Sequence, residues 1–495
     1  MYDSAVAADK RGDVRTASQL LLNLAVVHPT DGRVWCRLAR LRRASGDQDG
    51  ARAVLQSALQ VVPKCGFVWH ALAELERARG HVAEARLLFR RAVTVDPALS
   101  RAYDAWGRME SAAGNLAVAK ALFHKGLRAD RASHRLWHAY GVALDRTGEA
   151  PKARAAFAEG LRLAPANPHL MTAAAVADFR AGRTAEARTL LGRCLRLNPR
   201  FVPAWLASAQ LEEREGNVDL ARHRYRQGTR ACTDARKIGA GTGTAGGNDG
   251  SNGRLSVQLW QGWARLEELA GDKRAAVRVY SQASLLFEAD AELWVQWAKL
   301  EADLGSPLKA REIVRQAVRI APRKARPYHA SAELEMELGQ HERARVLFFK
   351  GAAASDGGPD LAPLLVSWAI CEWRLKSVER ARALFEWAAR MWDGRRGYVF
   401  EQWARFEVAQ GNAALASHYA SRAITAEPSY WEAWQLWAEL EEGRGNAERA
   451  TEYRQMAQSL RAQAEVHGGR RFEDHPLKRR WGGIPPLPLA ERLRL

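Results

Sequence analysis

The chain has 495 residues, too many for one compact core of ordinary size, so its length indicates several domains or a repeat array. Lys and Arg number 75 against 56 Asp and Glu, and the resulting +19 is typical of proteins that bind polyanions, nucleic acid above all, although Arg-rich solvated helix faces would give the same total. No apolar run approaches the roughly 18 residues of a membrane span, and the five cysteines show none of the spacings of a disulfide framework or zinc site.

The first recognisable pattern begins at the N-terminus. Ala5, Gly12, Ala17, Leu21 and Pro29 occupy the places that a repeat opening at Met1 would give them. The chain therefore starts inside or at the edge of a repeat. Because arrays usually begin with a polar cap, we expect a truncated N-terminus, and no signal or transit sequence is visible in this chain.

A 34-residue period then runs through residues 1–232. Large residues open successive units at intervals of 34, a small residue follows four places on, Gly eleven on, Ala sixteen on and a large apolar residue twenty on. The opening residues are Trp35, Trp69, Tyr103, Trp137, Met171 and Trp205, and the glycines are Gly46, Gly80, Gly114, Gly148, Gly182 and Gly216.

This pattern predicts a helical hairpin in every unit. The small residue allows the second helix to approach the first, Gly forms the turn, and Ala and the large apolar residue pack the second helix back. Pro63, Pro97, Pro165 and Pro199 end the second helix in most units. Since one pair cannot bury its apolar faces alone, the units must stack. We therefore predict an all-α, right-handed superhelix (α-solenoid) of about twelve helix-turn-helix repeats.

Residues 233–256 interrupt the period with GAGTGTAGGNDGSNG and similar polar residues, which predict a Gly-rich flexible loop. A phosphate-binding loop would need GxxxxGK[ST] after a strand, and neither is present. The period resumes over residues 257–461, with units opening at Trp260, Trp294, Tyr328, Leu365, Phe400 and Trp434, and residues 462–495 form a basic, Pro-containing tail.

Two further positions recur in these units. Glu stands seven places after the opening residue where the tetratricopeptide consensus has Tyr, and Ala-Arg or Ala-Lys opens the second helix. The glutamates are Glu76, Glu110, Glu212, Glu267, Glu301, Glu335, Glu372, Glu407 and Glu441, and the cations are Arg52, Arg86, Lys120, Arg154, Arg188, Arg222, Arg311, Arg345 and Arg382. We interpret both as internal ion pairs that fix helix packing, in preference to ligand contacts.

Together these features resemble the half-a-TPR (HAT) repeat, which is found mainly in proteins of RNA metabolism. A chain built almost wholly of such repeats looks most like the chloroplast factors of plants and green algae that process and stabilise psbB and psbH transcripts, and the ending DHPLKRRWGGIPPLPLAERLRL suits that group. The resemblance implies RNA binding and a chloroplast (stroma) location.

Charge on the expected inner surface differs between the two arrays. By helical geometry, and by analogy with the parent repeat, this surface takes first-helix places two before and one, five, eight and nine after the opening residue. In the first five units they hold Arg33, Arg40, Arg43, Arg77, Arg101, Arg108, Arg135, Arg146 and Arg180 against Glu74, Asp104 and Asp145. In the last six they hold Arg265, Lys299, Arg326, Arg374 and Arg405 against Glu268, Glu292, Asp303, Glu333, Glu337, Glu401, Glu432, Glu439 and Glu442.

The nine arginines, with His70 and His138 beside them, are our candidate RNA-binding residues, because a basic groove suits a single-stranded phosphate backbone and Arg planes can stack on unpaired bases. The acidic half suits a basic protein segment or self-association. We find no catalytic cluster, metal site or cofactor motif, so the prediction is a non-enzymatic scaffold that binds single-stranded RNA near the 5′ end of chloroplast transcripts and supports their processing, stabilisation and translation. The alternative is a protein-interaction scaffold in a splicing or polyadenylation type of complex.

Overall fold

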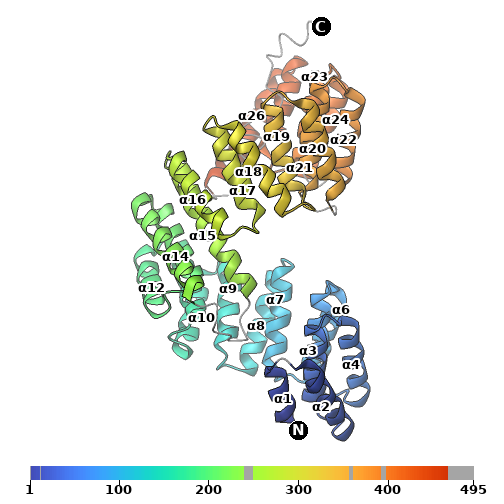
Figure 1. The fold of residues 1–495 in the computed structure, drawn as a ribbon, viewed down its shortest axis with the longest axis vertical. Helices are drawn as coiled ribbons and strands as arrows, with labels where there is room; N and C mark the ends of the chain where they lie inside the picture. The colour runs from blue at the N-terminus through green and yellow to red at the C-terminus, as the bar shows by residue number, and fades with distance from the viewer. Residues whose placement is uncertain (1, 12, 239–248, 356–359, 392–396, 467–495) are drawn as a thin grey trace. The chain divides into compact units, whose positions relative to one another are not determined.

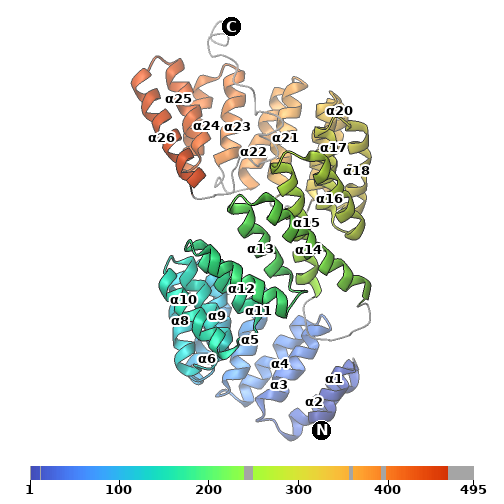
Figure 2. The same ribbon diagram turned by 90° about the vertical axis from the view of Figure 1, so that its left-hand side faces the viewer.

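The computed structural model describes residues 2–11, 13–238, 249–355, 360–391 and 397–466. These residues form 26 α-helices and no strand. The chain falls into two compact units, Met1–Leu266 and Glu267–Leu495, which are described separately here. Figures 1 and 2 show both units as successive helix pairs. The prediction of an all-α helical-repeat array is confirmed.

The N-terminal unit is a series of antiparallel hairpins, each made of an odd-numbered helix followed by an even-numbered one. Its helices are α1 (Tyr2–Lys10), α2 (Val14–Val27), α3 (Gly32–Ala44), α4 (Gln48–Val61), α5 (Gly66–Ala78), α6 (Val82–Val95), α7 (Ser100–Ala112), α8 (Leu116–Ala129), α9 (His134–Arg146), α10 (Ala150–Leu163), α11 (Pro168–Arg180), α12 (Thr184–Leu197), α13 (Val202–Arg214) and α14 (Val218–Ile238). Helix α15 (Asp249–Leu269) begins in this unit and ends in the next.

The C-terminal unit repeats the same hairpin, with helices of 13 or 14 residues except for α26, which has 20. Its helices are α16 (Lys273–Leu286), α17 (Ala291–Asp303), α18 (Pro307–Ile320), α19 (Ala325–Glu337), α20 (His341–Ala354), α21 (Leu361–Arg374), α22 (Val378–Met391), α23 (Gly397–Ala409), α24 (Ala413–Ala426), α25 (Trp431–Gly443) and α26 (Ala447–Val466).

Each hairpin turn has the geometry that the recurring Gly predicts. All six of the predicted turn glycines have positive φ, between 78° and 87°, a region that residues with a Cβ rarely adopt. The position recurs in the C-terminal unit, where Lys376, at φ 63°, replaces Gly in one turn. The recurring Gly therefore predicts these turns correctly. Among the described residues, Lys376 is the one non-Gly residue with positive φ.

The small residue four places after the opening residue permits close helix packing, as predicted. A Cβ added to Gly107 would lie 2.4 Å from the ring of Phe123, and one added to Gly141 would lie 2.6 Å from the ring of Phe157. Both rings are buried. The opening Trp also forms a hydrogen bond to the end of the preceding unit. The indole N–H of Trp69 donates to the carbonyl of Pro63 at 2.8 Å, and that of Trp205 donates to the carbonyl of Pro199 at 2.8 Å. The closing Pro thus also provides an acceptor that anchors the next unit.

Two predicted boundaries need correction. The loop expected over 233–256 is helical at both ends, because α14 continues to Ile238 and α15 starts at Asp249. Once a helix has formed, each further residue extends it at little cost. Residues 239–248, which carry most of the glycines, lie outside the described residues. The predicted tail also begins too early, since α26 runs to Val466.

Candidate functional site

The recurring Glu forms a buried ion pair with the Arg of the preceding unit. Arg86 binds Glu110 with two hydrogen bonds, of 2.6 and 2.9 Å, and Arg188 binds Glu212 with two of 2.8 Å. The same contact joins Arg52 to Glu76, Arg311 to Glu335, Arg345 to Glu372 and Arg382 to Glu407. In each pair the Glu side chain is at most 7% exposed. Each pair therefore links the second helix of one unit to the first helix of the next.

Further donors complete the surroundings of each Glu. Trp106 donates to Glu110 at 3.1 Å, and the amide of Asn115, after the turn, donates to the same carboxylate at 2.8 Å. The Trp recurs four places before Glu301 and Glu372, and the Asn five places after Glu212, Glu407 and Glu441. We did not foresee these donors from the sequence, although their constant spacing could have revealed them.

The ionised state of this Glu is strongly favoured. The hydrogen bond from Arg86 outweighs burial and lowers the pKa of Glu110 to about 2. In Glu212 the bond from Arg188 likewise lowers the pKa, and in Glu407 Arg382 and Asn412 overcome a large effect of burial in the opposite direction. The interpretation of the Glu and Arg positions as packing contacts is confirmed for these six pairs, whose members are therefore not available to a ligand.

One member of this set resembles a metal site. Glu76, His81 and Glu84 bring three ligand atoms within 4.8 Å of one another. Arg52, however, contacts Glu76 at 3.0 Å and Glu84 at 2.8 Å, and its positive charge opposes a bound cation. His81 occupies the place of the Asn donor in other units and contacts Glu76 at 2.8 Å. This group is therefore a variant of the recurring ion pair.

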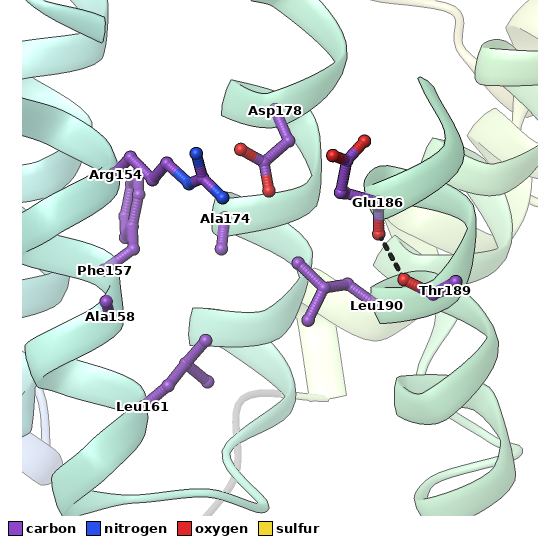
Figure 3. A pocket seen from close by; sticks show the side chains of 9 residues that line it. All are labelled: Arg154, Phe157, Ala158, Leu161, Ala174, Asp178, Glu186, Thr189 and Leu190. Carbon is purple, nitrogen blue, oxygen red and sulfur yellow. Dashed lines mark hydrogen bonds between the residues drawn. The ribbon is translucent and has the colours of Figure 1, made fainter. Parts of the chain in front are cut away.

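The contact fails where the unit carries Asp in place of Glu. Asp178 is too short to reach Arg154 and pairs instead with Arg183 at 2.7 Å. A cavity of about 300 Å³ lies at this interface, lined by Arg154, Phe157, Ala158, Leu161, Ala174, Asp178, Glu186, Thr189 and Leu190 (Figure 3). The cavity lies on the side of the second helices, and several of its lining residues are exposed. We interpret it as a packing defect at the interface between the two repeats.

The first helices pack against one another along each unit. In the N-terminal unit α3 contacts α5, α5 contacts α7, α7 contacts α9, α9 contacts α11 and α11 contacts α13. In the C-terminal unit α17 contacts α19, α19 contacts α21 and α23 contacts α25. In the N-terminal unit the first helices from α3 to α13 thus form one continuous layer, and side chains at equivalent places lie in rows across it, while in the C-terminal unit these contacts join α17 to α21 and α23 to α25.

All nine arginines of the predicted site are exposed, in rows on α3, α5, α7, α9 and α11. We call this set the basic face: Arg33, Arg40, Arg43, Arg77, Arg101, Arg108, Arg135, Arg146 and Arg180. Six of them pair with the carboxylates of Asp9, Asp31, Glu74, Asp104 and Asp145. Nine arginines against five carboxylates leave an excess of four positive charges on the basic face.

Three arginines of the basic face have no carboxylate partner among the described residues. These are Arg43, Arg101 and Arg146, of which Arg146 donates to Ser111 at 3.1 Å. Phe67 lies in the same row as Arg33 and Arg101, and its ring is 46% exposed. The charge pattern that predicts the nine arginines carries no signal for an aromatic residue. The basic face therefore combines guanidinium groups with one exposed aromatic surface.

The two histidines beside the basic face contribute shape more than charge. His70 packs on Phe89 and His138 on Phe157, with ring centroids 6.1 and 6.5 Å apart. Burial lowers the pKa of His70, and burial followed by the charge of Arg108 lowers that of His138 to about 4. Both rings are neutral at pH 7, so the positive charge of this surface comes from arginine.

The corresponding layer of the C-terminal unit is acidic. We call the acidic face the set Glu292, Asp303, Glu333, Glu337, Glu401, Glu432, Glu439 and Glu442, which lies on α17, α19, α23 and α25. The expectation that these side chains are all exposed was wrong. Glu333, Glu401 and Glu432 are 7%, 0% and 2% exposed. How deeply the first-helix layer is covered depends on packing across several units, which the repeat pattern of one unit does not encode.

A partly buried Arg lies among these carboxylates. Arg405, on α23, pairs with Glu401 and lies 3.9 Å from Glu439. Burial acts to lower its pKa, but Glu401 and Glu439 outweigh this effect and raise it. Tyr398 and Tyr430 are buried nearby, and burial followed by the charge of Glu401 raises the pKa of both phenols. Both tyrosines thus belong to the hydrophobic core of this unit.

Comparison with known proteins identifies the repeat in part of the chain. Tetratricopeptide repeat models match residues 37–75, 105–168 and 172–235. No curated protein matches the chain. None of the described helices combines the length and apolarity of a membrane span.

Similar solved structures include the Cut9–Hcn1 hetero-tetramer of the APC/C (12% identity, TM-score 0.35, covering 88% of this chain and 95% of that one) and yeast Tom70 (13%, 0.39, 79% and 91%). A third is a monomeric mutant of IFIT1 with Gppp-AAAA (16%, 0.35, 86% and 90%). At these TM-scores the likenesses carry no functional argument. Residues 37–75, 105–168 and 172–235 thus match tetratricopeptide repeats, and the chain is a helical-repeat scaffold.

Proposed function

We propose that the N-terminal unit binds single-stranded RNA along the basic face. The observation that carries this proposal is the excess of four exposed positive charges, arranged in rows on five successive first helices. Rows of guanidinium groups at helix spacing follow a phosphate backbone, and the released counterions drive binding. Internal carboxylates already neutralise part of the face, so the affinity depends mainly on the arginines that they leave uncompensated.

Phe67 supports a single-stranded ligand over a duplex. Its exposed ring lies in the row of Arg33 and Arg101, where an unpaired base can stack while neighbouring phosphates contact the guanidinium groups. Base stacking on an aromatic ring is worth about 1–3 kcal/mol by alanine substitution. A duplex keeps its bases stacked internally and would gain nothing from this ring.

An extended RNA footprint needs no catalytic group to be useful. A bound scaffold blocks exonucleases and prevents the covered RNA from pairing with itself, which supports processing, stabilisation and translation of the transcript. The narrower assignment, to the 5′ ends of chloroplast transcripts, rests on the resemblance to the HAT family and is part of the proposal.

The second candidate is a protein-interaction scaffold in an RNA-processing complex. The matches to tetratricopeptide repeats over residues 37–75, 105–168 and 172–235 favour it, because such repeats mediate protein interactions. The candidates differ in which ligand occupies the first-helix layer of the N-terminal unit.

Ultraviolet crosslinking of the full chain in cells, followed by sequencing of the bound RNA and mapping of the crosslinked peptides, separates the two. RNA binding on the basic face predicts defined RNA footprints and crosslinks in α3–α11, Phe67 among them. A chain that recovers protein partners but no RNA footprint would be the protein scaffold instead.

A further inference from the structure

The row of first-helix residues that contains Phe67 also contains the exposed imidazole of His169. We propose that His169 is a second base-stacking position, so that one RNA strand is held by two stacked bases, one on Phe67 and one on His169. The proposal rests on the proposed function, because it takes single-stranded RNA as the ligand, but it assigns a residue outside the nine arginines of the basic face.

His169 and Phe67 occupy equivalent places in their repeats. Each is the second residue of its first helix, α11 and α5, and each stands two places before the opening residue of its unit. The residues at this place on α7 and α9 are Arg101 and Arg135. Since α5, α7, α9 and α11 contact one another in succession, two guanidinium groups separate the two rings along the row.

The imidazole of His169 is held in place but not covered. Its ring meets that of Phe201, the N-cap residue of α13, at a centroid distance of 4.8 Å and an angle of 82°. An edge-to-face contact of this kind occupies at most one of the two faces of the imidazole. His169 is exposed and Phe201 half-buried, so one face of the imidazole is free to receive a base.

His169 also lies near the histidine that borders the basic face. Burial, followed by the charges of Arg108 and His169, lowers the pKa of His138, which places these side chains close together. The second ring is therefore next to the guanidinium groups that we propose to contact phosphates.

The two arginines between the rings are available to phosphates. Arg101 has no carboxylate partner among the described residues, and Arg135, with a side chain 71% exposed, lies 3.9 Å from its one listed carboxylate neighbour, Asp104. Any base can stack on a planar ring, whereas phosphates are attracted to the guanidinium groups. A strand that follows this row thus meets a ring, two cations and a second ring.

The separation of the rings sets the length of RNA that can use both. Packed helices lie about 8–10 Å apart, so the three steps from α5 to α11 cover roughly 24–30 Å. A stacked strand rises about 3.4 Å per nucleotide, so at most about nine nucleotides separate the two bases, and an extended strand needs fewer. Three consecutive bases span only about 14 Å even if extension doubles this rise, so they reach one ring at a time.

The test compares two RNAs of eighteen nucleotides. One is oligouridine, and the other is the same strand with stable abasic sugars everywhere except at three central uridines. Oligouridine can stack on both rings at once, so Phe67→Ala and His169→Ala should each weaken its binding by about five- to 150-fold. On the abasic strand the three bases can move to the remaining ring, so each single substitution should have a much smaller effect, and only the double variant should show the larger loss.

Two further variants separate stacking from charge and from general surface effects. His169→Phe keeps a ring and removes any imidazolium charge, so it should retain the native affinity for oligouridine. The matched control is His124→Ala, which should leave the affinity unchanged. His124 is an exposed residue of α8, a second helix of the same unit, and its ring lies 6.2 Å from that of Tyr140.

The outcomes distinguish this inference from the proposed function. Native affinity in His169→Ala, together with a loss in Phe67→Ala, would overturn the second stacking position and leave RNA binding on the basic face intact. Equal losses in His169→Phe and His169→Ala would also overturn it, because charge and not stacking would then hold the RNA. If the native chain bound neither strand, the proposed function would fail and the stacking position with it.

Discussion

The two units are built from the same hairpin, but the charged side chains on their first helices differ in sign and in burial. In the N-terminal unit the nine arginines of this layer are exposed, whereas in the C-terminal unit Glu333, Glu401 and Glu432 are buried. Equivalent places five after the opening residue show the difference, since Arg108 has a side chain 50% exposed and Arg405 one of 17%. One repeat pattern thus gives an exposed basic face in the first unit and buried ion pairs in the second.

The largest effect should come from breaking that network. Arg405→Ala leaves the fully buried Glu401 without its guanidinium, which should cost about 3–5 kcal/mol of unfolding free energy. Arg108→Ala removes the exposed pair with Asp104 and should cost at most about 1 kcal/mol. Denaturant unfolding followed by circular dichroism measures both. Similar losses of unfolding free energy in the two variants would contradict the difference between a buried ion pair in one unit and exposed ones in the other.

The small residue of the first helix should tolerate an added methyl group less well in a unit that has Gly there than in one that has Ala. Gly141→Ala pushes a Cβ into the ring of Phe157, 2.6 Å away, and should cost about 1–3 kcal/mol. Units of the C-terminal array already carry Ala at this place, for example Ala404, which is fully buried. Thermal unfolding should show a lower Tm for Gly141→Ala, whereas an unchanged Tm would mean that the first and second helices can separate freely.

The recurring Glu should make stability depend on acid. The pKa of Glu110 is about 2 in the folded chain, against an ordinary value of 4.5, so its contribution is fully present above pH 4.5 and is lost as the pH falls through 2. Denaturant midpoints measured from pH 6 to pH 2 should therefore fall less steeply in Glu110→Gln, which should itself cost about 1–3 kcal/mol at neutral pH. If the denaturant midpoints of the native chain and of Glu110→Gln fell in parallel with pH, the pKa of Glu110 would not be lowered in the folded chain.

A smaller and opposite effect is expected at the one non-Gly turn among the described residues. Lys376→Gly relieves a left-handed conformation and should raise stability by about 1 kcal/mol, visible as a higher denaturant midpoint. Gly411→Ala, in the next turn of the same unit, is the matched reverse substitution and should lower it by a similar amount. A destabilised Lys376→Gly would mean that the Lys side chain has a role beyond the turn.

Much of this architecture could be predicted from residue spacing because the repeat acts through neighbours. The glycine turns, the Gly107–Phe123 contact and the Arg86–Glu110 pair each involve one hairpin or two adjacent ones, so one period of sequence contains both partners. The positions and exposure of the basic face followed from the same periodicity.

Features that depend on several units, or on side-chain length, could not be predicted in this way. The burial of Glu401 and Glu432 arises from the packing of successive first helices, and the Arg154 cavity from the single methylene that separates Asp178 from Glu. The extensions of α14 and α26 beyond their expected ends depend on helix propagation, for which polar residues give little signal.

The salt dependence of RNA affinity is the most direct test of whether the N-terminal unit binds RNA along the basic face. On single strands the slope of log K against log salt is about −0.7 per neutralised phosphate. Arg43→Glu, Arg101→Glu and Arg146→Glu alter the three arginines of the basic face that have no carboxylate partner among the described residues, so RNA affinity should fall and the slope should flatten by at least about 2. The matched control is Arg90→Glu, Arg128→Glu and Arg193→Glu, exposed residues on second helices of the same unit with the same change in net charge. A near-native slope is expected for this control, and equal flattening in both variants, or none in either, would contradict RNA binding on the basic face.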